Sequence, residues 1–264
     1  MVVSSGWEAR QIVEAGCLAD SLGLDFFLVT DHYITPVSDS SVDAWAVLAA
    51  LAARTENILL GTCMTPIPFR PPQQLAKVVA TVDQISNGRA VLGVGAGWSK
   101  PEFDAYGKWD DDRTRVAKTV EGLELITKLW TAREPFDFAG KYYSSRGAIL
   151  KPKPIQQPHP PFWFGGRGQY MVKKVAAKYG DAWLPPVPGM QEDEYRRVLS
   201  LVREGVGGGR AIKVMFNGTL PEILSSLDKY AEMGCEATML VRTPFEDLPS
   251  AMRVLRKTAQ SYKR

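Results

Sequence analysis

The residue pair Asp31 and His32 is the part of the sequence best suited to proton transfer. It directly follows the predicted strand 25–30, DFFLVT. Histidine exchanges protons near neutral pH, and an adjacent carboxylate can orient the ring or contact a ligand. The alternative is that Asp31 caps a turn beside an incidental histidine. Because the chain contains only two histidines, of which the other is His159, we favour a catalytic role for Asp31 and His32.

Small residues and glycines follow three other predicted strands. The segment 61–72, GTCMTPIPFRPP, offers small polar residues to a planar ligand, and its prolines stiffen the loop. Gly95 and Gly97 allow a close approach of the backbone to a ligand and leave N–H groups for an anion. The segment 162–169, FWFGGRGQ, leads from a strand into a helix, whose N-terminus attracts anions and where Arg167 adds a positive charge. Each of these segments is weak evidence for a ligand site when taken alone, since glycines after a buried strand are often structural. Arg70, in the segment 61–72, is best explained by a structural ion pair.

Composition and charge restrict the function. The chain has 264 residues, a net charge of +3 and 45% hydrophobic residues, which indicates a soluble globular protein without a nucleic-acid partner. Three cysteines that are far apart in the sequence favour no disulfide framework, and two histidines exclude a multi-histidine metal site. No segment has the length of a membrane span or the pattern of a signal peptide. We therefore expect a cytoplasmic protein that binds a small molecule, no metal and no membrane.

Strands and helices alternate along the chain. Strands are predicted at 2–4, 25–30, 58–62, 90–94, 162–164, 181–184, 212–216 and 237–241. Helices are predicted at 8–22, 43–55, 72–86, 113–129, 170–178, 192–204, 221–233 and 248–261, and 135–161 reads as an irregular excursion. The simplest closed arrangement is an α/β fold of the (β/α)8 TIM-barrel type, a single domain over 1–264, with a doubly wound open sheet as the alternative. In a barrel the carboxyl ends of the strands bring all the segments above to one mouth.

Four segments match a known family in sequence order. They are TDHY at 30–33, the long segment 61–98 that ends in AVLGVGAGW, LKPKPIQQPHPPFWFGGRG at 150–168 and YGDAWLP at 179–185. Together they resemble the luciferase-like monooxygenase superfamily, most closely the branch that uses the deazaflavin coenzyme F420. The resemblance covers residues 5–187 and resumes at 218–241.

The resemblance implies a TIM barrel with the isoalloxazine-like ring across the carboxyl ends of the strands. By position, Asp31 would approach the polar edge of the ring, and His32 would be an acid/base or would position the substrate. Thr62, Cys63 and Met64 would contain a non-prolyl cis peptide bond, at Cys63–Met64 or one residue earlier, that forms a bulge behind the ring. The residues implied to hold the phosphate and tail of the coenzyme are Gly95, Ala96, Gly97, Gly165, Gly166, Arg167 and Gly168.

Two positions bear on cofactor and substrate. Bacterial luciferase-type enzymes resemble this chain but carry an arginine to the flavin phosphate where it has Ala96, which favours F420 over FMN. Deazaflavin-linked glucose-6-phosphate dehydrogenase has a catalytic glutamate where Trp98 stands, and this tryptophan is placed to pack on a ring. We therefore expect an oxidoreductase that transfers a hydride between reduced F420 and a small organic substrate other than a sugar phosphate. The alternatives are an FMN-dependent two-component monooxygenase and a non-catalytic barrel that binds flavin or deazaflavin.

The chain also departs from the family pattern. Its first strand is short, and residues 216–219 join the strand 212–216 almost directly to the helix 221–233, where the family usually has an insertion of several tens of residues. That loss could open the active site or abolish turnover. The helices 43–55 and 72–86 are expected to form a homodimer, because the first is apolar nearly all round and because the resemblance implies the same pairing.

Overall fold

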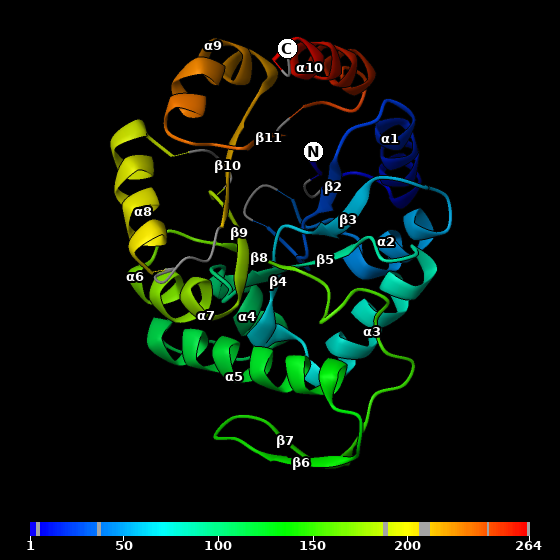
Figure 1. Ribbon diagram of the computed structural model, residues 1–264, viewed down its shortest axis with the longest axis vertical. Helices are drawn as coiled ribbons and strands as arrows, with labels where there is room; N and C mark the ends of the chain where they lie inside the picture. The colour runs from blue at the N-terminus through cyan, green and yellow to red at the C-terminus, as the bar shows by residue number, and fades with distance from the viewer. Residues whose placement is uncertain (4–5, 36–37, 187–189, 206–211, 242, 263–264) are drawn as a thin grey trace.

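Among the described residues, nine parallel strands form one curled sheet: eight follow one another across it in the order of the sequence, and the short β4 (Thr65–Pro66) lies beside this path (Figure 1). The computed structural model describes residues 1–3, 6–35, 38–186, 190–205, 212–241 and 243–262. The strands are, in order across the sheet, β1 (Val2–Val3), β2 (Phe26–Val29), β3 (Leu59–Thr62), β5 (Ala90–Gly95), β8 (Phe162–Gly165), β9 (Gly180–Leu184), β10 (Lys213–Gly218) and β11 (Ala237–Leu240). The sequential order confirms the barrel-type α/β fold and rules out a doubly wound sheet, although no ladder joins β11 to β1 among the described residues.

Helices connect successive strands and surround the sheet (Figure 1). The long ones are α1 (Ala9–Ser21), α2 (Ala44–Ala52), α3 (Pro72–Ile85), α5 (Asp112–Thr131), α8 (Glu192–Gly205), α9 (Leu220–Glu232) and α10 (Leu248–Tyr262). The predicted helix 170–178 consists of α6 (Gln169–Met171), a π-helical segment η2 (Val172–Ala176) and α7 (Ala177–Tyr179). None of the helices described is long and apolar enough to cross a membrane.

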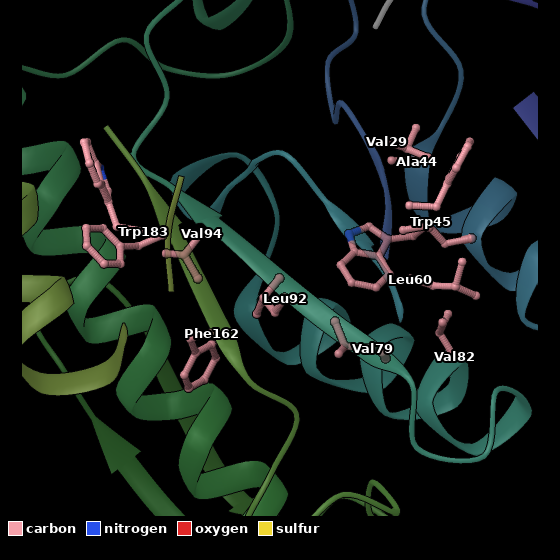
Figure 2. Packing of buried hydrophobic residues seen from close by; sticks show 14 of the residues in the cluster. Val29, Ala44, Trp45, Leu60, Val79, Val82, Leu92, Val94, Phe162 and Trp183 are labelled. Atoms are coloured by element: carbon pink, nitrogen blue, oxygen red, sulfur yellow. The ribbon is translucent and has the colours of Figure 1, made fainter. Parts of the chain in front are cut away.

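The strands are buried on both faces. On β2, Phe27 and Val29 belong to the layer between the sheet and the helices, whereas Phe26 and Leu28 belong to a second cluster inside the curl. This alternation follows from the two-residue period of a strand and explains the uninterrupted apolar run in the sequence. The outer layer includes the labelled side chains Trp45 and Leu60 (Figure 2), and the inner cluster includes Phe26, Leu28, Val91, Trp163, Ala182, Leu184, Met215, Met239 and Val241.

Several elements escaped the sequence analysis. The stretch 135–161 is not entirely irregular, since β6 (Phe136–Ala139) and β7 (Ser144–Ala148) pair there as an antiparallel hairpin. The hairpin lies outside the main sheet, and its residues are exposed or only half-buried. Its sequence therefore lacks the apolar run by which the buried strands were predicted. A two-residue strand β4 (Thr65–Pro66), a 3-10 turn η1 (Ile67–Phe69) and the short helix α4 (Lys100–Tyr106) were also missed, because each is too short for periodicity to reveal it.

The two expected departures from the family are present in the structure. Strand β1 has two residues, which pair with Leu28 and Val29 of β2. Strand β10 ends at Gly218 and helix α9 begins at Leu220, so Thr219 alone joins them. Its side chain and that of Glu222 form a capping box, which fixes the start of the helix directly after the strand.

Candidate active site

Four segments with predicted functional residues meet at the carboxyl ends of β2, β3, β5 and β8, which are neighbours in the sheet. Direct contacts join them. The ring centroid of His32, after β2, lies 5.7 Å from that of Trp98, after β5. Thr65, just after β3, donates a hydrogen bond to Asp31. The structure therefore brings the sequence-predicted residues together at one mouth.

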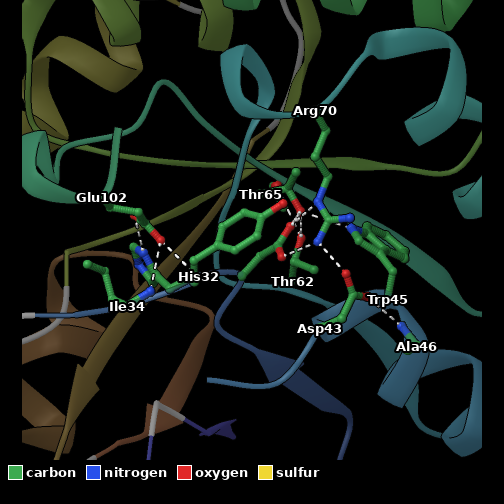
Figure 3. Close-up of polar contacts among 12 residues, drawn as sticks. His32, Ile34, Asp43, Trp45, Ala46, Thr62, Thr65, Arg70 and Glu102 are labelled. Atoms are coloured by element: carbon green, nitrogen blue, oxygen red, sulfur yellow. Dashed lines mark hydrogen bonds and ion pairs between the residues drawn. The ribbon is translucent and has the colours of Figure 1, made fainter. Parts of the chain in front are cut away.

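Asp31 is buried in an ion-pair network, of which Figure 3 labels the partners Thr65, Arg70 and Asp43. Its Oδ1 accepts from Arg70 Nη2 at 2.7 Å, and its Oδ2 accepts from Arg70 Nε at 3.1 Å and from the Thr65 hydroxyl at 2.7 Å. Arg70 Nη2 also donates to Asp43 at 2.8 Å, and Trp45 Nε1 donates to the Thr65 hydroxyl oxygen at 3.0 Å. The expected structural pairing of Arg70 is confirmed, and both carboxylate oxygens of Asp31 are already bound.

The charges in this network reinforce one another. Burial alone would lower the pKa of Arg70, but the charges of Asp31 and Asp43 and the hydrogen bonds to them hold it above its usual range. Burial alone would raise the pKa of Asp43, but its bonds to Arg70 and to the backbone of Ala46 hold it below its usual value. These shifts favour the charged forms of Arg70 and Asp43, and the network ties the end of β2 to the start of α2.

His32 is held by a carboxylate that the sequence analysis did not single out. Its Nδ1 lies 2.9 Å from Oε2 of Glu102, a residue of α4 with only 1% of its surface exposed. Glu102 Oε1 accepts from the backbone N–H groups of Tyr33 at 2.6 Å and Ile34 at 3.4 Å (Figure 3). No local pattern identifies this glutamate, because its helix is too short to be predicted and because acidic residues are common in the sequence.

Aromatic side chains line the mouth beside His32. Trp98 is 60% exposed and meets the histidine ring edge to face. Tyr33 stacks on Tyr106 with centroids 4.8 Å apart, and both are about half exposed. Phe69 and Phe103 pack behind them, 4.5 Å apart. Together these rings form an apolar wall next to the titratable imidazole.

The peptide bond between Cys63 and Met64 is cis, which confirms the prediction for this segment. Neighbouring glycines make room for it. A Cβ atom on Gly93 would lie 1.7 Å from the carbonyl oxygen of Thr62, and one on Gly165 would lie 2.8 Å from Met64 Cγ. Gly95 also faces Met64, with its Cβ position 3.1 Å from that of the methionine. These glycines thus admit the segment 62–64, and the packing requires them whether or not a ligand is bound.

The turn after β8 is more open. Gly166 has a φ of +121°, a conformation that side chains rarely adopt, and its carbonyl accepts from Trp183 Nε1 at 3.0 Å. A Cβ on Gly168 would meet no atom within 4 Å. Arg167 is exposed and lies 3.2 Å from Glu194 in an ion pair, so part of its charge is compensated. This turn leads into α6.

The turn after β5 offers little positive charge. Ala96 has no charged side chain, and the guanidinium that contacts this turn belongs to Arg115, whose Nε donates to the carbonyl of Gly97 at 3.3 Å. That guanidinium also donates to the backbone carbonyl of Asp110, forms an ion pair with Asp112 and lies 3.7 Å from the ring of Trp109. The part of the chain that the structure describes contains no group of three or more histidine, cysteine or acidic side chains able to hold a metal ion.

This chain belongs to the luciferase-like monooxygenase family. The family pattern matches residues 2–220, most of the described fold and all four segments of the mouth. The protein is therefore an enzyme of the family's general type. An F420-dependent glucose-6-phosphate dehydrogenase from Amycolatopsis mediterranei is 30% identical over 233 residues, which cover 87% of this chain and 68% of the relative. An FMNH2-dependent dimethylsulfone monooxygenase from Pseudomonas putida is 30% identical over 215 residues, which cover 81% of this chain and 58% of the relative.

Solved structures support the fold. An F420-dependent secondary alcohol dehydrogenase superposes with a TM-score of 0.81 at 19% identity, covering 97% of this chain and 96% of that chain. An F420-dependent tetrahydromethanopterin reductase from Methanopyrus kandleri gives 0.79 at 18% identity, covering 97% and 96%. At these identities the likeness establishes the luciferase-like barrel alone. The chain spans between 58% and 68% of the length of the two curated relatives named above.

Proposed function

We propose that the protein transfers a hydride between reduced coenzyme F420 and a small organic substrate. The observation that carries this proposal is that His32, the segment 62–64 and the glycine turns follow the carboxyl ends of four neighbouring strands. In α/β barrels this is where ligands bind and react. When bound, F420 gives or takes the hydride, and the protein supplies binding, orientation and proton transfer.

The residues at the mouth fit a planar heterocycle. Cys63 and Met64 are partly exposed next to the glycines that admit them, and the ring would lie against this segment. The open turn of Gly165, Gly166, Arg167 and Gly168 is our proposed site for the phosphate and tail, together with Gly95, Ala96 and Gly97. A side chain at Gly168 would project into the open space that a ligand there would use. Asp31 would act from behind this surface, by holding Arg70 and Thr65, rather than as a direct contact.

The choice of F420 over FMN depends on the turn after β5. Luciferase-type enzymes bind the flavin phosphate with an arginine where this chain has Ala96. The guanidinium of Arg115, which contacts the turn, already donates to the backbone carbonyls of Gly97 and Asp110 and pairs with the carboxylate of Asp112. Redirecting it to a phosphate would break these bonds. A relative that uses F420 and a relative that uses FMNH2 both match at 30% identity, so sequence identity does not distinguish the two cofactors. The charges at the turn after β5 are the stronger support for F420.

The substrate we propose is uncharged rather than a sugar phosphate. Trp98 stands where glucose-6-phosphate dehydrogenases of this family carry a catalytic glutamate, and it is 60% exposed beside His32. An exposed aromatic face binds apolar or planar groups and offers no charge to a phosphate. His32 is the residue we propose to exchange a proton with the substrate.

An anaerobic assay tests the reaction. The protein is mixed with reduced F420 and a panel of small aldehydes, ketones and enones, and the return of oxidised F420 is followed by its absorbance. Turnover of an uncharged carbonyl compound without oxygen supports the proposal. Turnover that requires reduced FMN and oxygen would support the two-component monooxygenase instead. Binding of F420 with no turnover across the panel would favour a non-catalytic barrel, in keeping with the direct connection between β10 and α9.

We also propose that residues 1–264 form one domain that works in the cytoplasm as a homodimer. The strands of one sheet run through the chain in sequence order, which supports a single domain. The three cysteines are free thiols, as is usual for a reducing compartment. Val78 and Ile85 on α3 are exposed, and an apolar pair on this helix is suited to contact with a second copy.

A further inference from the structure

We infer that Glu102 is the positioning residue that keeps the proton of neutral His32 on Nδ1 and leaves Nε2 free to exchange a proton with the substrate. The inference extends the proposed function, from which it takes the role of His32. Its structural part, the tautomer of His32, can be measured without coenzyme or substrate.

The two oxygens of Glu102 have different partners. Oε1 accepts from the backbone N–H groups of Tyr33 and Ile34, and Oε2 lies 2.9 Å from Nδ1 of His32. The backbone N–H groups can only donate, and a carboxylate can only accept. Nδ1 must therefore carry the hydrogen in this contact. Burial of Glu102 at 1% exposure excludes water as a competing partner.

The remaining nitrogen of His32 is left for the substrate. Nε2 has no hydrogen-bond partner among the described residues, and 11% of the side chain is exposed. The ring meets the exposed indole of Trp98 at 5.7 Å. A substrate seated against Trp98 would thus meet the unprotonated Nε2, because Nδ1 is turned to Glu102.

This arrangement specifies the proton step. During oxidation of a hydroxyl substrate, the C–H bond breaks and its electron pair leaves as hydride to oxidised F420. The O–H proton passes to Nε2 of His32, and the carbon–oxygen double bond forms. In reduction the imidazolium returns the proton to the carbonyl oxygen as hydride reaches the carbon. Glu102 stabilises the imidazolium through Nδ1 without itself taking the proton.

The variant Glu102→Gln separates orientation from packing. Glutamine has nearly the same shape, and its carbonyl oxygen must stay on the Tyr33 and Ile34 N–H groups, which need an acceptor. Its NH2 group then faces Nδ1 and donates to it. The neutral ring is forced to carry its hydrogen on Nε2, so it can no longer accept a proton there.

The experiment is a long-range nitrogen–proton NMR spectrum of the full chain with labelled histidine, at a pH where the ring is neutral. Only His32 and His159 contribute, and His32→Ala assigns them. The control is Glu121→Gln, because Glu121 likewise accepts three backbone N–H groups, those of Lys141, Tyr142 and Tyr143, but binds no histidine in the structure. We expect His32 as the Nδ1–H tautomer in the wild type and in the control, and as Nε2–H in Glu102→Gln.

Kinetics on a substrate found by the assay complete the test. We expect Glu102→Gln to lower kcat by roughly 10²–10⁴-fold with coenzyme affinity unchanged, and Glu102→Asp to recover part of the rate. A wild-type His32 in the Nε2–H form, or a Glu102→Gln variant that keeps Nδ1–H, overturns the inference. If Glu102→Gln does not fold, the spectra of the wild type and of Glu102→Asp still show which nitrogen of His32 carries the hydrogen, and so test the inference. A protein with the expected tautomers that binds no F420 would refute the proposed function and leave the role of Glu102 intact.

Discussion

Asp31 and Glu102 are both buried carboxylates at the carboxyl ends of the strands, and each holds a different neighbour. Asp31 binds the guanidinium of Arg70 and the hydroxyl of Thr65, whereas Glu102 binds His32 and the backbone that follows it. Asp31 and His32 are adjacent in the sequence, but they belong to two different networks of contacts. Asp31 fixes the scaffold, and His32 is held by a residue 70 positions further along the chain.

We expect His32→Ala to lower kcat by roughly 10²–10⁴-fold, because the substrate loses its proton donor and acceptor. Coenzyme affinity is expected to change little, since the proposed ring and phosphate contacts come from other segments. Steady-state kinetics and a coenzyme titration on the same preparation measure both effects. A variant with near-normal kcat would reduce His32 to a loop residue.

Asp31→Asn is expected to destabilise the fold by about 2 kcal/mol, because the amide replaces one charged acceptor of Arg70 while Asp43 keeps the other contact. Chemical denaturation monitored by fluorescence gives the free energy of unfolding. The control is Asp104→Asn, whose ion pair with Lys100 is about half exposed and is expected to contribute less than about 1 kcal/mol. If both variants lose the same free energy of unfolding, the buried network stabilises the fold no more than the exposed ion pair does.

The sequence analysis identified His32 and Asp31 but not Glu102, the partner of the Nδ1 nitrogen of His32. Position after a strand and the scarcity of histidine were enough to select His32. The contact with Glu102 depends on where α4 places a single side chain, which no pattern in the segment 99–107 encodes. The pairing of Arg70 was expected in kind, but its partners Asp31 and Asp43 lie 39 and 27 positions away and emerged only with the fold.

At the scale of elements, β3 and β5 approach so closely that a glycine is required between them. A Cβ on Gly93 would lie 1.7 Å from the carbonyl oxygen of Thr62, which is backbone and cannot rotate away. The segment 62–64 with its cis peptide bond occupies the space that this glycine and its neighbours leave open. The sequence analysis assigned Gly95 and Gly165 to a coenzyme, but their first role in the structure is to accommodate Met64.

Gly93→Ala is expected to destabilise the protein by more than about 3 kcal/mol, because the two strands must separate to admit the methyl group. Gly168→Ala is the control. It has a φ of −78° and open space around the new methyl group, so it should change the free energy of unfolding by less than about 1 kcal/mol. Thermal or urea unfolding of the two variants provides the comparison. A Gly93→Ala variant as stable as Gly168→Ala would mean that β3 and β5 do not approach as described.

Long periodic elements were predictable and short ones were not. Apolar runs and helical spacing located the eight strands that follow one another across the main sheet, and the long helices, since each buries a continuous face. The hairpin β6–β7 and helix α4 are held instead by contacts of individual side chains with residues far away in the sequence. Glu121 binds the hairpin turn at Lys141, Tyr142 and Tyr143. Contacts of this kind leave no local period in the sequence.

At the scale of the whole molecule, the apolar character of α2 has an internal explanation. Trp45, Leu48 and Leu51 are all buried within this chain, and Trp45 donates a hydrogen bond to Thr65. The expected use of this helix in a homodimer therefore gains no support from its composition. The remaining argument comes from Val78 and Ile85, which are exposed on the neighbouring helix α3.

The proposal that α3 forms the contact of a homodimer can be tested by the mass of the protein in solution. Light scattering at micromolar concentration should give twice the chain mass, and Ile85→Lys should shift the protein toward the monomer because a charge would be buried in the contact. The matched change Leu224→Lys, at an exposed site on α9, should leave the mass unchanged. A wild-type monomer under these conditions would contradict the predicted pairing.

The central claim is that this luciferase-like barrel is built for a deazaflavin coenzyme. The most direct measurement is a side-by-side titration of the protein with F420 and FMN, read by fluorescence quenching. Because Ala96 offers no charge to a flavin phosphate and Arg115 is already bound, we predict that F420 binds more tightly than FMN. If FMN binds tenfold tighter or more, a difference of about 1.4 kcal/mol in binding free energy, the account of the cofactor is wrong.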